Sequence, residues 1–447
     1  MSTTQAFAET LLGMTAAGLT PAAEAAAVDL LRDGLAVAHL GAHEPAPRLL
    51  TALAAEAGGA AEATVFAQGR PTRLPAAAAA RVNGAAMHVL DFEPMWNPAN
   101  HALSTSLPAL LALSEKLARA GGPAPDGARI LLALAVAIEA QARLRLASGQ
   151  FEPGLLLFHP PGMVGAIGSA AGCGILLRLA APALAQAMGI AASRAGGLIG
   201  NVGSMTKCLH CGDAAAAGLE AALLAGRGFT ADADAIGGPR GWGAAFSGAG
   251  FRPEALTEPA DWHIAHPGPA FKLYPSQYGT HFVITAAKSA REGWDGSTRI
   301  VAVAITAPAM AYVDRPLPAT GLAGKFSLQY TAAAALLDGH VGVASFSDAR
   351  RFAPDMVALL DKVTVIPDPG REGRFDRMRV DIAVTLADGR VLHGLCDGPP
   401  GIWGRPVDQA VLHAKWRDCL GEGLDAAAAG VAGFSAAQVL ALLEAMG

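Results

Sequence analysis

The stretch Thr298-Arg-Ile-Val-Ala-Val-Ala-Ile-Thr306 decides the fold class, because it interrupts a chain that otherwise has the pattern of successive helices. It is rich in β-branched residues with partial alternation, which predicts a β-strand. Residues 362–366 (KVTVI) have the same character. Residues 379–386 and 391–394 predict two more strands, and Asp388-Gly389 between them is typical of a hairpin turn.

Helical spacing of apolar residues dominates the chain before about Pro259. Residues 21–38 (PAAEAAAVDLLRDGLAVA) are the clearest example, since Thr20 can cap a helix whose first position is Pro21. Further helices are expected at 48–57, 76–90, 107–120, 127–147, 163–178, 181–193, 279–292, 326–338 and within 407–446.

This order of elements predicts a mainly α protein with an inserted α+β domain. We expect a helical domain over residues 1–265 and an α/β domain over 266–405. The C-terminal helices, residues 406–447, are expected to return to the helical domain.

Composition excludes several classes of protein. Hydrophobic residues make up 52% of the 447 residues and charged residues only 16%, so the chain can bury a large core and is not disordered. The net charge is −5, from 33 basic and 38 acidic residues, and the basic residues do not cluster. A nucleic-acid partner is therefore not expected.

The apolar character does not predict a membrane protein. The longest charge-free stretch, residues 153–177, is interrupted by three prolines and six glycines, whereas a spanning helix needs about 20 strongly apolar residues. The N-terminus has no basic region before an apolar segment, so no signal peptide is expected. Five cysteines, an odd and small number, indicate free thiols in a reducing compartment. We expect a cytoplasmic protein without a membrane partner.

Two polar clusters stand out in the helical part. Residues 87–101 (MHVLDFEPMWNPANH) lead from a helix into a loop, where Asp91 and His101 form either an acid–base or substrate-binding pair or a capped helix end. His159 precedes Pro160-Pro161 at the start of a glycine-rich helix. The free N–H groups of a helix start suit a carboxylate or phosphate, although a simple capping loop is the alternative.

A third cluster surrounds Lys207, in Gly203-Ser-Met-Thr-Lys-Cys-Leu-His-Cys-Gly-Asp213. Lys207 is the only lysine between Lys116 and Lys272, which is poorly explained by solubility and favours anion binding or proton transfer. Cys208 and Cys211 form a C-x-x-C pair, but no second pair exists to complete a metal site.

A fourth cluster, residues 271–281 (FKLYPSQYGTH), lies where the α/β part begins. Lys272, Gln277 and His281 are hydrogen-bonding groups within it, and a domain junction is a usual place for a ligand cleft. A structural hinge is the alternative interpretation.

The sequence lacks the common motifs for nucleotide and metal sites. It has no G-x-x-x-x-G-K-[ST], no H-E-x-x-H and no G-x-S-x-G. With no metal or nucleotide site visible in the sequence, acid–base chemistry by side chains is what remains.

Taken together, these clusters resemble the MmgE/PrpD family, which includes 2-methylcitrate dehydratase, cis-aconitate decarboxylase and iminodisuccinate epimerase. The resemblance covers about residues 5–440 and its motifs occur in family order. They are Asn83-Gly84, His88, Leu90-Asp91-Phe92, His101, Phe158-His159-Pro160, Ser193-x-Ala-Gly-Gly197, Thr206-Lys207-x-Leu-His210-x-Gly212, Lys272-x-Tyr-Pro275, His281, Arg315-Pro316, Phe326-Ser-Leu-Gln-Tyr330 and Asp338-Gly339.

The resemblance implies a large helical domain interrupted by a smaller α/β lid domain, a homodimer, and a site between the domains that uses no metal or organic cofactor. Carried over by motif, the expected catalytic residues are Asp91, His101, His159 and Lys207. The expected substrate-binding residues are Lys272, Gln277, His281 and Tyr312, with Tyr330 as a further candidate.

Three positions depart from the decarboxylase-like pattern of the family. Pro94 and Met95 stand where that pattern has a second acid and a threonine, and Gln277 stands where it tends to have histidine. These changes remove a hydroxyl and an imidazole, which puts cis-aconitate and 2-methylcitrate in question as substrates.

The resemblance implies a cofactor-independent lyase that acts on a small di- or tricarboxylic acid by proton transfer α to a carboxylate. Lys207, His101 and the helix start near Pro160 would hold the acid, and His159 or another base would move the proton. An isomerase or epimerase of a dicarboxylate and a non-catalytic carboxylate-binding protein are the alternatives.

Overall fold

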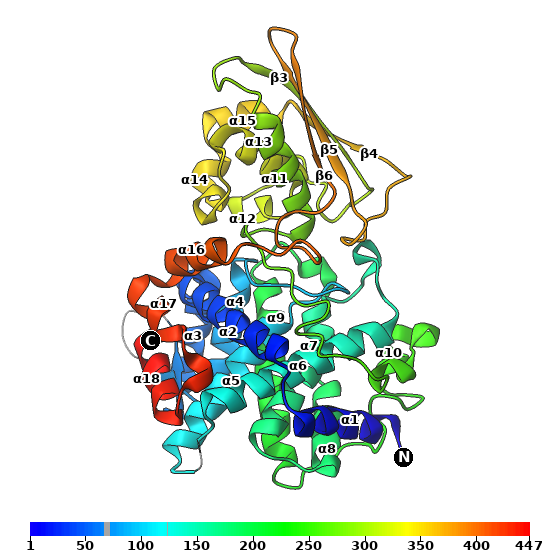
Figure 1. The fold of residues 1–447 in the computed structure, drawn as a ribbon, viewed down its shortest axis with the longest axis vertical. Coiled ribbons are helices and arrows are strands. Elements are labelled where there is room, and N and C mark those ends of the chain that lie inside the picture. The colour runs from blue at the N-terminus through cyan, green and yellow to red at the C-terminus, as the bar shows by residue number, and fades with distance from the viewer. Residues whose placement is uncertain (67–71, 123) are drawn as a thin grey trace.

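The computed structural model describes residues 1–66, 72–122 and 124–447, which form a helical domain and a smaller α/β domain (Figure 1). Each domain has its own hydrophobic core. One core draws on residues between 7 and 264 and again between 412 and 446, and the other on residues between 270 and 402 together with Met95. The predicted fold class, mainly α with an inserted α+β domain, is confirmed.

The helical domain is built mostly from long helices. They are α1 (Thr3–Ala17), α2 (Pro21–Gly41), α3 (Pro45–Ala57), α4 (Ala76–Val89), α5 (Ala102–Arg119), α6 (Gly127–Ser148), α7 (Pro160–Leu176), α8 (Ala181–Ala192), α9 (Thr206–Ala225) and α10 (Trp242–Ser247). Short 3-10 helices lie at Pro153–Leu155, Ile199–Asn201, Gly248–Gly250 and Pro253–Leu256. A two-stranded antiparallel sheet, β1 (Ala63–Val65) and β2 (Thr72–Leu74), was not predicted, because three-residue strands carry almost no periodic signal.

Helix α7 lies at the centre of this domain and packs against α5, α6, α8 and α9. Its glycines allow the close approach, since a Cβ on Gly165 would lie 2.5 Å from the Thr105 side chain. A Cβ on Gly218 of α9 would lie 2.6 Å from the Ala166 backbone oxygen. Ala- and Gly-rich sequence therefore serves tight helix packing here.

The α/β domain contains a four-stranded sheet in the order β4-β3-β5-β6. Its strands are β3 (Ile300–Ala307), β4 (Val363–Pro367), β5 (Val380–Leu386) and β6 (Val391–Cys396). The pair β3/β4 is parallel, whereas β3/β5 and β5/β6 are antiparallel. All four strands lie where the sequence predicts them, within two residues at each end.

Helices cover one face of that sheet, with α11 packed on β5 and β6 and α13 packed on α11 (Figure 1). The helices of this domain are α11 (Tyr278–Arg291), α12 (Gly321–Gly324), α13 (Leu328–Asp338), α14 (Asp348–Arg351) and α15 (Pro354–Leu360), with a 3-10 turn at Val343–Phe346. The helix predicted at 326–338 begins two residues later, because the Ser327 hydroxyl accepts from the Tyr330 N–H and caps it.

The chain returns to the helical domain through α16 (Gln409–Leu420), α17 (Glu422–Ala428), the 3-10 helix Val431–Gly433 and α18 (Ala436–Met446). Helix α16 packs on α2 below the α/β domain, and α18 contacts α5 and β1 (Figure 1). The predicted boundaries at 265/266 and 405/406 fall in turns between elements.

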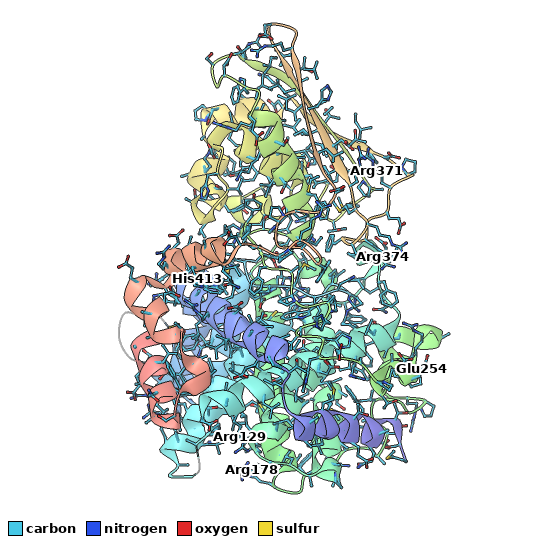
Figure 2. The ribbon with its side chains drawn as sticks, in the orientation of Figure 1. Arg129, Arg178, Glu254, Arg371, Arg374 and His413 are labelled. Carbon is cyan, nitrogen blue, oxygen red and sulfur yellow. The ribbon has the colours of Figure 1, made fainter. Side chains whose placement is uncertain are left out.

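Charged side chains such as Arg129, Arg178, Arg371 and Arg374 lie at the periphery of the two domains (Figure 2). Helix α9 is long and apolar enough to cross a membrane by length and composition, as are α1 and α2 taken together across a bend of 101°. However, 67% of the apolar window of α9 is buried inside the protein. Helix α9 is therefore packed mostly inside the helical domain.

Candidate active site

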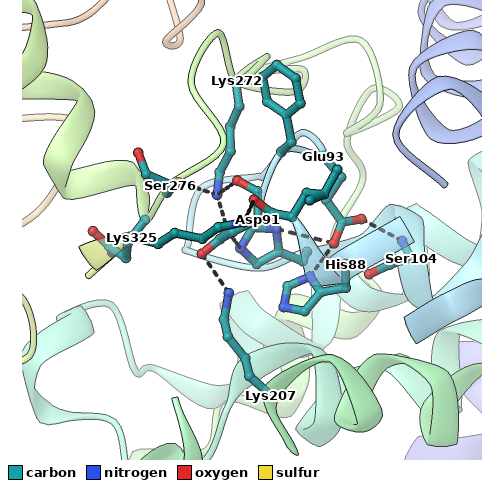
Figure 3. Close-up of polar contacts among 12 residues, drawn as sticks. His88, Asp91, Glu93, Ser104, Lys207, Lys272, Ser276 and Lys325 are labelled. Carbon is teal, nitrogen blue, oxygen red and sulfur yellow. Dashed lines mark hydrogen bonds and ion pairs between the residues drawn. The ribbon is translucent and has the colours of Figure 1, made fainter. Parts of the chain in front are cut away.

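Asp91 lies at the junction of the two domains, two residues beyond the end of α4. Its φ is +53°, a left-handed conformation that Asp tolerates better than most residues and that turns the chain sharply. Lys207 Nζ, on α9, donates to Asp91 Oδ2 at 2.7 Å. Lys272 Nζ approaches from the other side and donates to Asp91 Oδ1, to Asp91 O at 3.0 Å and to Ser276 O at 3.0 Å (Figure 3).

These contacts fix the ionisation of Asp91. Burial alone would raise the pKa of its carboxyl, but the ammonium groups of Lys207 and Lys272 hold that pKa well below its usual range. Burial lowers the pKa of Lys272 to about 8, although the negative charge of Asp91 acts to raise it. Near pH 7, Asp91 is therefore a carboxylate held between two ammonium groups.

Three histidine rings gather beside this ion pair. The ring centroids of His88 and His101 are 4.8 Å apart, and those of His88 and His159 are 5.4 Å apart. His101 Nε2 is 3.7 Å from Asp91 Oδ1. Burial is the main reason that the pKa values of all three rings lie well below 6.5, and Lys207 lowers them further. The imidazoles are therefore neutral near pH 7 and can act as bases.

Glu93 is buried behind His101, and its Oε2 accepts from the Ser104 N–H at 2.8 Å. Its Oε1 contacts His88 Nδ1 and lies 3.6 Å from His101 Nδ1 (Figure 3). Burial raises the pKa of Glu93 to about 8, although the bond from Ser104 and the charge of Lys272 act in the opposite direction. Glu93 is therefore a protonated carboxyl that adjoins two neutral imidazoles.

A cavity of about 200 Å³ opens between the domains beside these groups. Its polar wall contains Asp91, Asn100, His101, His159, Lys207, Gln277, Tyr278, Tyr312 and Arg315. Its apolar wall contains Met95, Ala99, Pro153, Gly154, Leu156, Pro160, Pro161, Ile199, Val202, Phe326 and Phe375. Both domains contribute to the lining, as expected of a cleft closed by a lid.

The four predicted catalytic residues, Asp91, His101, His159 and Lys207, all line this cavity. Of the predicted substrate-binding residues, Gln277 and Tyr312 line it as well. Gln277 also accepts from the Gly279 N–H at 2.6 Å and caps α11.

Lys272 and His281 are fully buried outside the cavity lining. Lys272 lies behind Asp91, so it holds the carboxylate rather than facing the cavity. His281 is stacked on Tyr278 at a centroid distance of 4.7 Å. Tyr330, the further candidate, donates to Ser345 O inside the α/β domain. None of these three side chains lines the cavity.

The helix start near Pro160 differs from expectation. Pro160 and Pro161 have no N–H, and the next two amides, those of Gly162 and Met163, donate to His159 O at 3.0 and 3.1 Å. The first turn of α7 thus offers no free amide to an anion. It instead fixes His159, whose own N–H donates to Gly197 O at 2.8 Å.

The sequence interpretation missed three groups. Arg315 lines the cavity and its Nη2 donates to Val202 O at 3.3 Å, across the domain junction. Asn100 precedes His101 in the same loop and also lines the cavity. Glu93 lies within the polar cluster at residues 87–101, but the sequence interpretation gave it no role. The Arg315-Pro316 motif and the position of Glu93 two residues after Asp91 were signals for two of these groups, but nothing distinguished Asn100.

Two sets of three side chains within the described residues bring donor atoms to within 4.8 Å of one another: His88, His159 and Cys211, and His88, Glu93 and His101. Besides burial, the charge of Lys207 lowers the pKa values of His88, His101 and His159, so both sets of donor atoms lie beside a positive charge. That charge repels a divalent cation, so this environment does not suit one.

The fold and the site define a two-domain enzyme with an acid–base cavity at the domain junction. The family models for the MmgE/PrpD N-terminal domain and the MmgE/PrpD C-terminal domain match residues 5–254 and 274–432. The chain therefore belongs to the MmgE/PrpD family, as its motifs suggested, and it is a lyase of the decarboxylase or dehydratase type.

Several relatives share most of their length with this chain. A cis-aconitate decarboxylase from Mus musculus is 34% identical over 426 residues, which are 93% of this chain and 86% of the relative. One from Homo sapiens is 36% identical over 353 residues, 77% of this chain and 73% of the relative. A cis-aconitate decarboxylase-like protein from Aspergillus oryzae is 26% identical over 418 residues, 87% of this chain and 84% of the relative.

Proposed function

We propose that this lyase removes CO₂ or water from a small di- or tricarboxylate by proton transfer at the carbon α to a carboxylate, without a cofactor. The observation that carries the proposal is the pairing of neutral histidines with the buried ammonium group of Lys207 in one cavity. His101 and His159 supply bases, and Lys207 supplies positive charge beside them.

Carboxylate binding would rest on two cations. Lys207 Nζ and Arg315 Cζ lie 5.2 and 5.5 Å from the centre of the Phe326 ring, so both border the same part of the cavity. Two carboxylates of one small acid could each face a cation there. Asp91, held by Lys207 and Lys272, would repel a third carboxylate and orient the substrate.

The chemical step follows from these positions. In a dehydration, a neutral imidazole takes the α-proton, the electron pair forms the new double bond, and hydroxide leaves the neighbouring carbon and takes a proton to become water. In a decarboxylation, the bond to the lost carboxyl breaks and the electron pair left on carbon takes a proton. Lys207 stabilises the negative charge in either reaction. One such donor typically raises the reaction rate by about 10²–10³.

Turnover of a panel of carboxylates tests the proposal. The panel comprises cis-aconitate, 2-methylcitrate, citrate, citramalate (2-methylmalate) and iminodisuccinate, with CO₂ release and alkene absorbance as readouts. Release of CO₂ or gain of an alkene supports a lyase. Interconversion without mass loss indicates an epimerase, and binding without turnover indicates a carboxylate-binding protein; either result contradicts the proposal.

We propose that the protein is a homodimer. Leu155, Leu157, Leu198 and Met205 have 79%, 75%, 61% and 47% of their surface exposed, and Ile199 N donates to Leu157 O at 3.0 Å, so the two loops adjoin. An exposed apolar patch of this kind is typical of an interface. Light scattering on a sizing column should give twice the mass of the chain, and Leu157→Asp should give the monomer mass.

We propose a cytoplasmic location for this protein. All five cysteines are free and buried, which suits a reducing compartment. Cell fractionation should recover the protein with soluble cytoplasmic markers, and recovery with membranes or the culture medium would contradict the assignment.

A further inference from the structure

Three buried lysines donate to three successive backbone carbonyls in the Asp91 turn (residues 90–92), which follows α4. The three bonds are Lys325 Nζ to Leu90 O at 2.9 Å, Lys272 Nζ to Asp91 O at 3.0 Å, and Lys415 Nζ to Phe92 O at 2.9 Å. Lysine is almost never buried without a partner that compensates its charge. Three of them on one turn therefore indicate that the position of this turn matters.

The three lysines come from separate parts of the chain. Lys272 precedes α11 and Lys325 follows α12, both in the α/β domain, whereas Lys415 lies in α16 of the helical domain. Lys272 and Lys325 extend toward Asp91 in Figure 3. The Asp91 turn is thus held from both domains at the point where they meet.

The conformation of the turn explains why it needs these bonds. Asp91 has a φ of +53°, and the left-handed region is unfavourable for a residue with a Cβ. Leu90 is the C-cap of α4, so its carbonyl lies at the negative end of a helix, where a cation is favoured. Hydrogen bonds from ammonium groups are also stronger than those between neutral groups.

Burial of Lys325 is not offset by an ion pair. Its side chain is 5% exposed, and among the described residues no carboxylate lies within 4.0 Å of its Nζ. Lys415 is buried as well, but its Nζ pairs with Asp33 Oδ1 at 2.7 Å and lies 4.1 Å from the centre of the Phe92 ring. A buried ammonium group is costly, so the bond to Leu90 O is the contact that accounts for Lys325.

We infer that Lys325 and Lys415 are positioning residues, which hold the Asp91 turn so that the Asp91 carboxylate stays beside Lys207 at the cavity. The inference rests on the proposed function, because it gives the placement of Asp91 a part in turnover. Neither lysine lines the cavity, so both act through the turn. A displacement of about 1 Å in a reacting group can lower the rate by about 10²-fold.

Hydrogen exchange measured by mass spectrometry on the full-length protein reads the turn directly. The reporter segment is residues 90–95, in which the Asp91 N–H donates to His88 O at 2.9 Å and the Met95 N–H to Ala270 O at 3.1 Å. Exchange at these amides requires local opening of the segment. This readout needs no substrate.

Two variants remove the ammonium groups. Lys325→Met keeps the length of the side chain and breaks no ion pair. Lys415→Met is combined with Asp33→Asn, because Asp33 would otherwise be left as a buried, unpaired carboxylate. We expect exchange of residues 90–95 to rise at least tenfold in each variant, while exchange of α6 stays within threefold of the wild type.

Steady-state kinetics on an acid that the wild-type protein turns over gives the second readout. Both variants should lower kcat about 10- to 100-fold, because the Asp91 carboxylate is misplaced. KM should stay within about threefold, because Lys207 and Arg315 still face the substrate. A merely structural role would lower the melting temperature and leave the kcat of the folded protein unchanged.

Two controls remove comparable interactions without touching the turn. Lys362 Nζ also donates to a backbone carbonyl, Ile300 O at 3.2 Å, but beside the sheet of the α/β domain. Asp33→Asn alone keeps the bond from Lys415 to Phe92 O. Lys362→Met and Asp33→Asn should both stay within threefold of the wild type in exchange of residues 90–95 and in kcat.

The outcomes separate the inference from the proposed function. Wild-type exchange of residues 90–95 in a variant would overturn the role of that lysine, and so would faster exchange with an unchanged kcat. If the wild-type protein turns over no acid, the proposed function fails and the exchange measurement alone decides whether the lysines hold the turn. Lys325→Met tests the inference even if the double variant does not fold.

Discussion

Replacing Glu93 by glutamine should change how the stability of the protein depends on pH. Glu93 has no exposed surface, and its pKa is raised from 4.5 to about 8 because burial disfavours its charge. The folded protein therefore keeps a proton on Glu93 that the unfolded chain releases above pH 4.5. The unfolded state binds fewer protons between pH 4.5 and 8, so folding becomes less favourable as pH rises through that window.

The size of the expected stability change follows from the interval between the two pKa values of Glu93, 4.5 in the unfolded chain and about 8 in the folded protein. Each pH unit between the two pKa values is worth about 1.4 kcal/mol, so the wild-type protein should lose up to about 4 kcal/mol between pH 5 and pH 8 relative to Glu93→Gln. Glutamine keeps the size of the side chain and has no proton to lose. The two proteins should be closest in stability near pH 5, and the variant should gain over the wild type toward pH 8.

Urea unfolding of both proteins at half-unit intervals from pH 5 to pH 8 measures this difference. The control is Glu139→Gln, because Glu139 is also buried but its pKa is lowered by His263 and Arg143 against the effect of burial. A lowered pKa contributes stability above 4.5 that is lost only on further acidification, so this control should show a constant difference from wild type over the same range. A constant difference for Glu93→Gln would refute the assignment of a protonated Glu93.

Three further predictions concern activity. Lys207→Met should lower kcat/KM by about 10²–10³ with folding intact, because Lys207 stabilises the developing negative charge; steady-state kinetics beside circular dichroism checks this, and an unchanged kcat/KM would contradict it. In a plot of kcat/KM against pH, the fall on the acidic side should have its midpoint below pH 6.5, because the pKa values of His101 and His159 are lowered mainly by burial. A midpoint at or above pH 6.5 would show that another group acts as the base. Dialysis against EDTA should leave kcat unchanged, with metal analysis of the dialysed protein as the check, since the donor atoms near His88 do not suit a cation.

Much of the fold and part of the site could be predicted from the sequence. The strands at 298–306 and 379–386 were predictable because β-branched runs contrast with Ala-rich helices. Lys207 was conspicuous because a single lysine in 155 residues of apolar sequence, between Lys116 and Lys272, calls for a reason. Asp91 and His159 were found as parts of polar clusters and of family motifs.

The remainder depended on three-dimensional packing that no local pattern encodes. Lys272 and His281 lie in one short polar segment with Gln277, yet of these three side chains only Gln277 lines the cavity. The side-chain amide of Asn100, in a loop, donates to Gln141, which lies 41 residues away on α6. The proline pair at 160–161 identified a helix start correctly, but the carbonyl of His159 occupies its first free amides.

The most direct test of the central claim is proton NMR of the reaction in D₂O. The claim is that His159 transfers the proton at the carbon α to a carboxylate and that Lys207 stabilises the negative charge that develops there. With a carboxylate that the wild-type protein turns over, we predict that one deuteron is exchanged or incorporated at that carbon, and that His159→Ala and Lys207→Ala, shown to be folded, do neither at a comparable rate. Exchange at the wild-type rate in either variant would contradict the account.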